Sequence, residues 1–125
     1  MTISKYFNVK SGIFDSKKEK TRLLELLQLE KDGSISNISQ QKTFLLVPTF
    51  KGNDGKLERQ ITYKADFCYQ DNLKNIFVVE DVKSEFTSKF PVYIIKRKLF
   101  KNKYPEIFFY ENIMGKNKIG KKECD

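Results

Sequence analysis

Residues 63–83, YKADFCYQDNLKNIFVVEDVK, predict two strands joined by a polar turn. Both flanks are rich in β-branched and aromatic residues, and the intervening QDNLKN has the composition of a turn. If the hairpin is symmetric about its turn, Asp66 lies opposite Asp81. Side chains alternate along a strand, so Asp81 and Lys83 share one face while Glu80 points to the other. The hairpin is therefore expected to bring two acids and a lysine together.

The two opposed carboxylates require an explanation, because like charges directly opposite each other destabilise a sheet. A divalent cation between Asp66 and Asp81 would offset the repulsion, since Mg²⁺ typically takes one or two carboxylates and keeps several waters. Alternatively, Lys64 and Lys83 balance the acids on a solvated face, or a β-bulge changes the register and separates them. Simple strand alternation also places Cys68 on the face of Asp66.

The segment before the hairpin predicts a first helix that carries a third acid. Ser16 is a suitable N-cap, Glu19 follows three residues later as in a capping box, and Gly33 suits the position after the last turn. On a helical wheel Glu19 falls within a leucine stripe expected to face the sheet, whereas Glu25 faces solvent. A carboxylate in such a stripe is costly unless it is paired or bound to a metal. Glu19 can thus cap the helix, bind a metal, or do both.

The rest of the chain is expected to complete one domain. ISNISQQKTFLLVPTF predicts a strand, and KGNDGK after it predicts a turn. A second helix is expected over Pro91–Lys103, with proline in its first turn, and EIFFYENI predicts a last strand. The order α-β-β-β-α-β predicts an α/β (α+β) fold, with a mixed sheet and a helix on each face. We expect one domain over residues 1–113 and a flexible basic tail over 114–125.

The composition favours a folded protein with a polyanionic partner. The 125 residues are 39% hydrophobic and 14% aromatic with a net charge of +8, which points to nucleic acid more often than to a membrane or an acidic protein. No stretch resembles a membrane span or a signal peptide, so we expect a cytoplasmic protein with no membrane partner. Cys68 and Cys124 lack metal-site spacing, and the absence of histidine removes the commonest general base.

The second predicted helix carries basic residues expected to hold the nucleic acid. With Val92, Ile95 and Leu99 as its inward stripe, the flanking cations can contact the phosphate backbone, which positions a nucleic acid without reading its sequence. A solvated amphipathic face is the alternative for any single lysine. The candidate nucleic-acid-binding residues are Lys96, which is the strongest of them, Arg97, Lys98, Lys101 and Lys103.

Four segments, FDSKKEKTRLLEL, ITYKADFCY, VVEDVKS and KRKLFKNKYP, resemble a phage-encoded family of uncharacterised proteins. That family is similar to the PD-(D/E)XK nucleases, whose restriction-endonuclease-like fold includes TnsA-type transposon endonucleases and Holliday-junction resolvases. The resemblance covers most of the chain, and it implies that Asp66, Asp81 and Lys83 are the Asp, the (D/E) and the Lys of the motif. Two positions depart from the pattern, because Ala65 precedes the first Asp and Ser84 follows the Lys, where Pro and Gly are expected.

The resemblance implies a Mg²⁺-dependent DNA endonuclease, located in the host cytoplasm if the protein is phage-encoded. Its substrate would be a branched recombination or replication intermediate, and two cuts would require a homodimer. Asp66, Asp81 and Glu19, which matches the helical Glu of the resolvase-like branches, would hold Mg²⁺ or Mn²⁺, while Lys83 would orient water or stabilise the transition state. Two rival classes stay open: a non-catalytic nucleic-acid-binding protein, and a phage interaction protein built on the nuclease scaffold.

Overall fold

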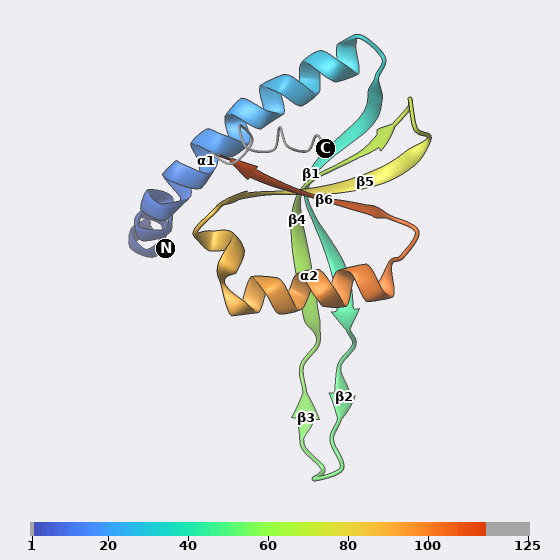
Figure 1. The fold of residues 1–125 in the computed structure, drawn as a ribbon. Helices are drawn as coiled ribbons and strands as arrows, with labels where there is room; N and C mark the ends of the chain where they lie inside the picture. The colour runs from blue at the N-terminus through green and yellow to red at the C-terminus, as the bar shows by residue number, and fades with distance from the viewer. Residues whose placement is uncertain (1, 115–125) are drawn as a thin grey trace.

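Figure 1 shows a mixed sheet between two helices. The structure is a computed structural model that describes residues 2–114, with side chains described from 17 to 113. The predicted order α-β-β-β-α-β is confirmed, with a small two-stranded arm inserted after the first long strand. The main elements are α1 (Thr2–Lys31), β1 (Ile35–Val47), β4 (Ile61–Asp71), β5 (Ile76–Ser84), α2 (Pro91–Lys103) and β6 (Phe108–Met114).

The strands of the sheet lie in the order β1-β4-β5-β6. β1, β4 and β5 are antiparallel neighbours, whereas β6 runs parallel to β5. Parallel neighbours cannot be joined by a tight turn, so the chain must return along the sheet before it enters β6. α2 makes this return, and the predicted β-α-β unit is therefore confirmed.

The sheet separates two apolar cores. On the α2 face Phe100 is fully buried, and its ring centre lies 5.2 Å from that of Phe44 and 5.6 Å from that of Phe109. On the α1 face Leu26 is fully buried and belongs to the same cluster as Phe67. Aromatic pairs in such tilted and edge-on arrangements add stability beyond the area that they bury. Each helix is therefore held to its own face of the sheet.

α1 begins far before its predicted start. Ser16 lies inside a continuous helix that starts at Thr2, so the predicted capping box of Ser16 and Glu19 is wrong. Capping serves only the first turn, where N–H groups lack carbonyl partners, and isolated Ser or Gly residues lower helix propensity without ending a helix. The predicted end is confirmed: Gly33 has a φ of 88°, and the N–H of Ser34 bonds back to a carbonyl of the last turn at 3.0 Å.

α2 has the predicted bounds, but two of the three residues of its predicted inward stripe do not face the sheet. Val92 and Ile95 are 65% and 56% exposed, and Leu99 is half-buried. Tyr93 and Phe100, seven positions apart, are the buried residues of this helix. Aromatic side chains bury more apolar area than valine or isoleucine. The helix therefore turns Tyr93 and Phe100 toward the sheet, with Ile94 and Leu99 packed beside them.

The arm extends beyond the end of the sheet, between β1 and β4 (Figure 1). It consists of β2 (Phe50–Lys51) and β3 (Leu57–Glu58), which pair antiparallel around the predicted KGNDGK turn.

At the other end of the chain, β6 includes Met114, the first residue of the predicted tail. The rest of that tail, residues 115–125, lies outside the described residues, as does Cys124. Within residues 2–114, neither helix has the length and apolar character needed to cross a membrane.

Candidate functional site

The β4–β5 hairpin has the register expected from its symmetry. Phe67 pairs with Glu80, and Asp66 and Asp81 are the next residues along the two strands. The paired ladder ends here, and the Asp66 carboxylate accepts a hydrogen bond from the backbone N–H of Val82 at 2.7 Å. The Asp66 side chain thus accepts a hydrogen bond from the N–H of Val82 at the point where the backbone pairing of β4 and β5 stops. This bond holds Asp66 at the point where the strands separate.

The alternation of side chains along β4 breaks near Asp66. Tyr63 belongs to the same core cluster as Cys68, on the α2 face, whereas Phe67 belongs to the cluster on the α1 face. In the neighbouring stretch of β1, Gln41 has a φ of 55°, a left-handed conformation that departs from regular strand geometry. Simple alternation, as used for Cys68 and Asp66, therefore did not predict that Tyr63 lies beside the acids.

Asp81 is a buried carboxylate with incomplete hydrogen bonding. Its exposed fraction is 1%, and the Nζ atom of Lys83 lies 3.2 Å from its Oδ2 atom. Among the side chains that the structure describes, Asp81 Oδ2 and the Tyr63 hydroxyl are buried atoms that make no hydrogen bond. Burial raises the pKa of Asp81 to about 7; Lys83 opposes this rise and the charge of Asp66 adds to it. The site thus favours a proton or a cation on Asp81.

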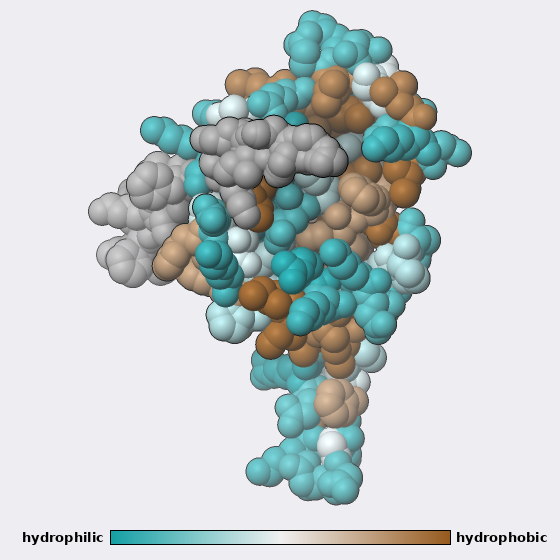
Figure 2. Space-filling view, in the orientation of Figure 1, coloured by the Kyte–Doolittle hydropathy of each residue, from teal (hydrophilic) through white to brown (hydrophobic). Residues whose placement is uncertain are grey.

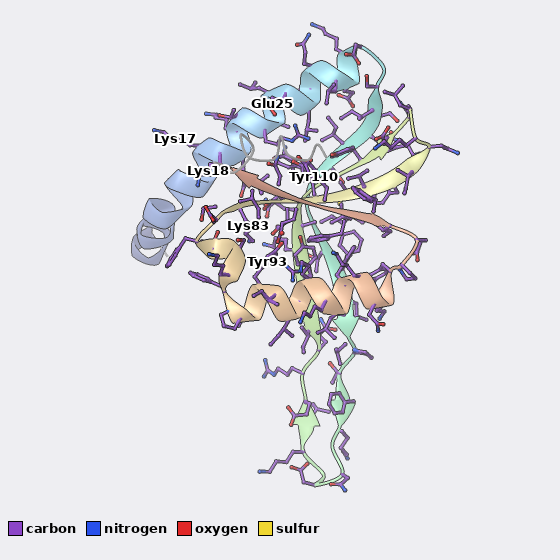
Figure 3. All side chains as sticks on the ribbon, viewed as in Figure 1. Lys17, Lys18, Glu25, Lys83, Tyr93 and Tyr110 are labelled. Carbon is purple, nitrogen blue, oxygen red and sulfur yellow. The ribbon has the colours of Figure 1, made fainter. Side chains whose placement is uncertain are left out.

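A pocket of about 310 Å³ opens beside the carboxylates, where α1, β5 and α2 meet. Lys83 reaches into this region with its Nζ atom 4.7 Å from the centre of the Tyr93 ring, a cation–π contact. Figure 3 shows these two side chains close together, between the helices. Asp81 lies buried next to Lys83 and does not line the pocket. The lining residues are Glu19, Asp66, Val82, Lys83, Thr87, Phe90 and Tyr93.

The three predicted metal ligands do not gather around one point. Among the described residues, no three His, Cys, Asp or Glu side chains lie close enough together to hold a metal ion. Glu19 shares the pocket with Asp66 but does not complete such a group. Two carboxylates with several waters are nevertheless sufficient for Mg²⁺. Asp66 and Asp81 fit this smaller donor set, although Asp81 Oδ2 already lies 3.2 Å from Lys83 Nζ.

Two tyrosines complete the surroundings of Asp81, and the sequence did not reveal their role. Burial raises the pKa of both hydroxyls far above its ordinary value, and the charge of Asp81 contributes at each. Both therefore stay protonated and can donate a hydrogen bond. Tyr93 donates a hydrogen bond to Glu111 at 2.5 Å. The Tyr63 hydroxyl is buried beside Asp81. An aromatic residue in a strand or helix is an ordinary core residue, so no sequence signal distinguished them.

Glu80 is buried on the opposite face, where it completes a polar network. As predicted, it points away from the pocket, and its exposed fraction is 0%. Its carboxylate accepts hydrogen bonds from Arg22 Nε at 2.6 Å, the Tyr69 hydroxyl at 2.7 Å and Asn112 Nδ2 at 2.9 Å. Arg22 follows Glu19 by three residues on α1, so this network fixes the part of α1 that borders the pocket. Nothing local in the sequence indicates a pair 58 positions apart.

Not every basic residue of α2 is available to bind a nucleic acid. Arg97 is half-buried, and its Nη1 atom lies 3.3 Å from Glu111 Oε2, the oxygen that also accepts the Tyr93 hydrogen bond. This contact braces α2 against β6. The other candidates are the partly buried Lys96 and the exposed Lys98, Lys101 and Lys103.

The fold and the pocket define a mixed α+β domain with an acidic site at the fork of an antiparallel hairpin. Over residues 3–117 the chain matches the family described as "Protein of unknown function (DUF1064)", and it belongs to that family. Neither a curated protein nor a solved structure matches the chain.

The raised pKa of Asp81 predicts that the metal-free protein loses stability as the pH rises. Between the ordinary pKa near 4 and the folded value of about 7, the folded state holds a proton that the unfolded state has lost. The free energy of unfolding should thus fall across this window. Urea titrations at about pH 5 and about pH 8 measure the difference, and Mg²⁺ should reverse the loss at the higher pH. A loss that persists unchanged in Asp81→Asn would contradict the assignment.

Proposed function

We propose that this protein is a metal-dependent DNA endonuclease that hydrolyses phosphodiester bonds. The proposal is carried by one observation: Asp66 and Lys83 line the pocket that Glu19 borders from α1, and the buried Asp81 lies directly behind them, 3.2 Å from Lys83. Two adjacent acids suit a divalent cation, and a lysine beside them supplies a fixed positive charge for a phosphate. The net charge of +8 and the resemblance to the PD-(D/E)XK nucleases support the same assignment.

The acids and the lysine of the site would have different roles in cleavage. Asp66, oriented by the Val82 N–H, and Asp81 would hold Mg²⁺ or Mn²⁺. When bound, such an ion lowers the pKa of a coordinated water and neutralises charge that develops on the phosphate. Lys83, positioned over the Tyr93 ring, would stabilise the negative phosphate oxygens at the pocket.

Glu19 would orient solvent from the pocket wall, on the side of α1. The Tyr63 hydroxyl, kept protonated by burial and by the charge of Asp81, would donate to the Asp81 carboxylate. Both groups act on the arrangement of the site, and neither is assigned to the phosphate itself.

Lys83→Ala separates catalysis from metal binding. Purified protein should cut DNA with Mg²⁺ or Mn²⁺ and should not cut it with a chelator. Lys83→Ala should lower the cleavage rate by about a hundredfold or more, because one preorganised donor contributes this much to a charged transition state. Mn²⁺ binding, measured by calorimetry, should be retained because Lys83 is not a ligand.

Lys74→Ala is the matched control, since Lys74 is an exposed lysine in the turn of the same hairpin. It should cut like the wild type. A fully active Lys83→Ala would remove Lys83 from the mechanism. If the wild type cuts neither linear, single-stranded nor branched DNA with either metal, the endonuclease proposal is wrong.

A non-catalytic nucleic-acid-binding protein is the second candidate function. It is favoured by the ion pair between Lys83 and Asp81, which neutralises the acid without a metal, and by the lack of a three-acid group among the side chains described over residues 17–113. The cleavage assay distinguishes the two. A branched phage replication or recombination intermediate as substrate, a homodimer for paired cuts and a host-cytoplasmic location belong to the nuclease proposal.

A further inference from the structure

The β2–β3 arm contributes little to the stability of the domain. Every residue from Pro48 to Gln60 is exposed, apart from the half-buried Gly52. Figures 1 and 2 show the arm standing clear of the main body, with a largely hydrophilic surface. A lone two-stranded hairpin buries too little apolar area to stabilise itself or its neighbours. An exposed ribbon of this kind is therefore better explained by a contact with another molecule.

The arm has a well-defined tip. Gly52 donates a backbone hydrogen bond to the Lys56 carbonyl at 2.8 Å, and Asp54 Oδ1 accepts one from the Lys56 N–H at 3.0 Å. Gly55 has a φ of 84°, and a Cβ atom on Gly52 would lie 2.9 Å from the Asp54 carboxylate. Gly55 thus requires glycine, whereas a side chain at Gly52 would displace the Asp54 carboxylate from the turn. The turn chemistry gives the ribbon one shape, which a specific contact needs.

The two faces of the arm differ in charge. Lys51 and Leu57 are cross-strand partners and share one face, whereas Phe50 and Glu58 share the other. Within β2 and β3, the face of Lys51 therefore carries no acid and presents an aliphatic side chain that is 67% exposed. The carboxylate of Asp54 is engaged by its own turn. The charged residues of the arm are basic Lys51, Lys56 and Arg59 and acidic Asp54 and Glu58.

We propose that the arm lies in the major groove of duplex DNA and is the duplex-gripping element of this protein. This inference rests on the proposed function and deepens it by naming the form of the substrate. The major groove of B-DNA is about 12 Å wide and admits a two-stranded ribbon. The basic residues then reach the flanking phosphates, and Leu57 meets the apolar thymine methyl groups. A-form RNA has a deep, narrow major groove that excludes such a ribbon.

Two variants test the arm. In the first, residues 50–58 are replaced by an Asn-Gly turn; in the second, the full arm carries Lys51→Gln, Lys56→Gln and Arg59→Gln. Binding is measured without metal, in an Asp81→Asn background, on fluorescent duplex DNA, single-stranded DNA and duplex RNA. Both variants should weaken duplex DNA binding at least about tenfold. The salt slope should fall by up to about 2.7, or 0.9 for each of three phosphates, in the substituted arm, and by up to about 1.8 in the shortened arm, which keeps Arg59. Affinity for the other two ligands should not change.

The control removes three exposed lysines elsewhere, with Lys20→Gln, Lys31→Gln and Lys74→Gln. If this control weakens duplex binding as much as the arm variants do, general charge explains the effect and the proposal is wrong. Unchanged duplex binding together with loss of a dimer in sedimentation would assign the arm to a protein contact instead.

The experiments distinguish a failure of the endonuclease proposal from a failure of the groove contact. A protein that grips duplex DNA through the arm and never cuts would overturn the nuclease alone. One that cuts with arm-independent affinity would overturn the groove contact alone.

Discussion

The Asp81→Asn variant should lose DNA cleavage by at least about a thousandfold and become more stable than the wild type. A bound metal supplies several kilocalories per mole of transition-state stabilisation, and each ~1.4 kcal/mol is a factor of ten in rate. Asparagine keeps the shape of the side chain but loses the charge that holds the ion. Stability rises because the wild-type carboxylate is buried beside Asp66, where its charged form is unfavourable. The measurements are cleavage with Mg²⁺ and the melting temperature.

Glu85→Gln is the comparison for this variant. Glu85 is an exposed acid just beyond the end of β5, so its neutral form should cut and melt like the wild type. DNA binding by Asp81→Asn should be intact or tighter, since one negative charge near the phosphate is gone. Retained cleavage in Asp81→Asn would show that the acidic fork is not the catalytic site. A lowered melting temperature would show that its carboxylate is a structural group.

Arg22→Ala should lower the free energy of unfolding by about 3–5 kcal/mol, because it leaves the Glu80 carboxylate buried without its cationic partner. This loss is a large share of the roughly 5–15 kcal/mol that a domain has in total. Glu80→Gln, which strand alternation would suggest as a silent change, should also destabilise the fold, since two donors of Arg22 then face a neutral amide. Urea unfolding followed by circular dichroism measures both variants.

Glu25→Ala is the control for the network. Glu25 pairs with the same arginine at 2.9 Å, but its side chain is 56% exposed, as predicted from the helical wheel. Its removal should cost less than about 1 kcal/mol, the usual value of a surface ion pair. Replacing both partners, Arg22→Met with Glu80→Leu, should recover part of the loss because no buried charge is left unpaired. A cost below about 1 kcal/mol for Arg22→Ala would show that the network does not hold α1.

Features set by neighbouring residues were predicted from the sequence. The turn chemistry and the equal distances of Asp66 and Asp81 from it gave the correct hairpin register. Gly33 marked the end of α1, because only glycine readily adopts the positive φ found there. The bounds of α2 followed from Pro91, which suits a first helical turn. Each of these depends on interactions within a few residues, which a local pattern records.

Contacts between distant segments could not be predicted from local sequence patterns. The pairing of Glu80 with Arg22 joins residues 58 positions apart, and either residue alone resembles an ordinary surface charge. The break in alternation that places Tyr63 beside Asp81 arises where β4 lies between β1 and β5. The face of α2 that is buried depends on the aromatic cluster against which the helix packs. These outcomes depend on which arrangement buries the most apolar area while satisfying each buried charge, a property of the whole fold. Local sequence patterns are thus enough to predict the order of the main elements, the hairpin register and the positions of Asp66, Asp81 and Lys83, whereas packing between distant segments creates the burial that raises the pKa of Asp81.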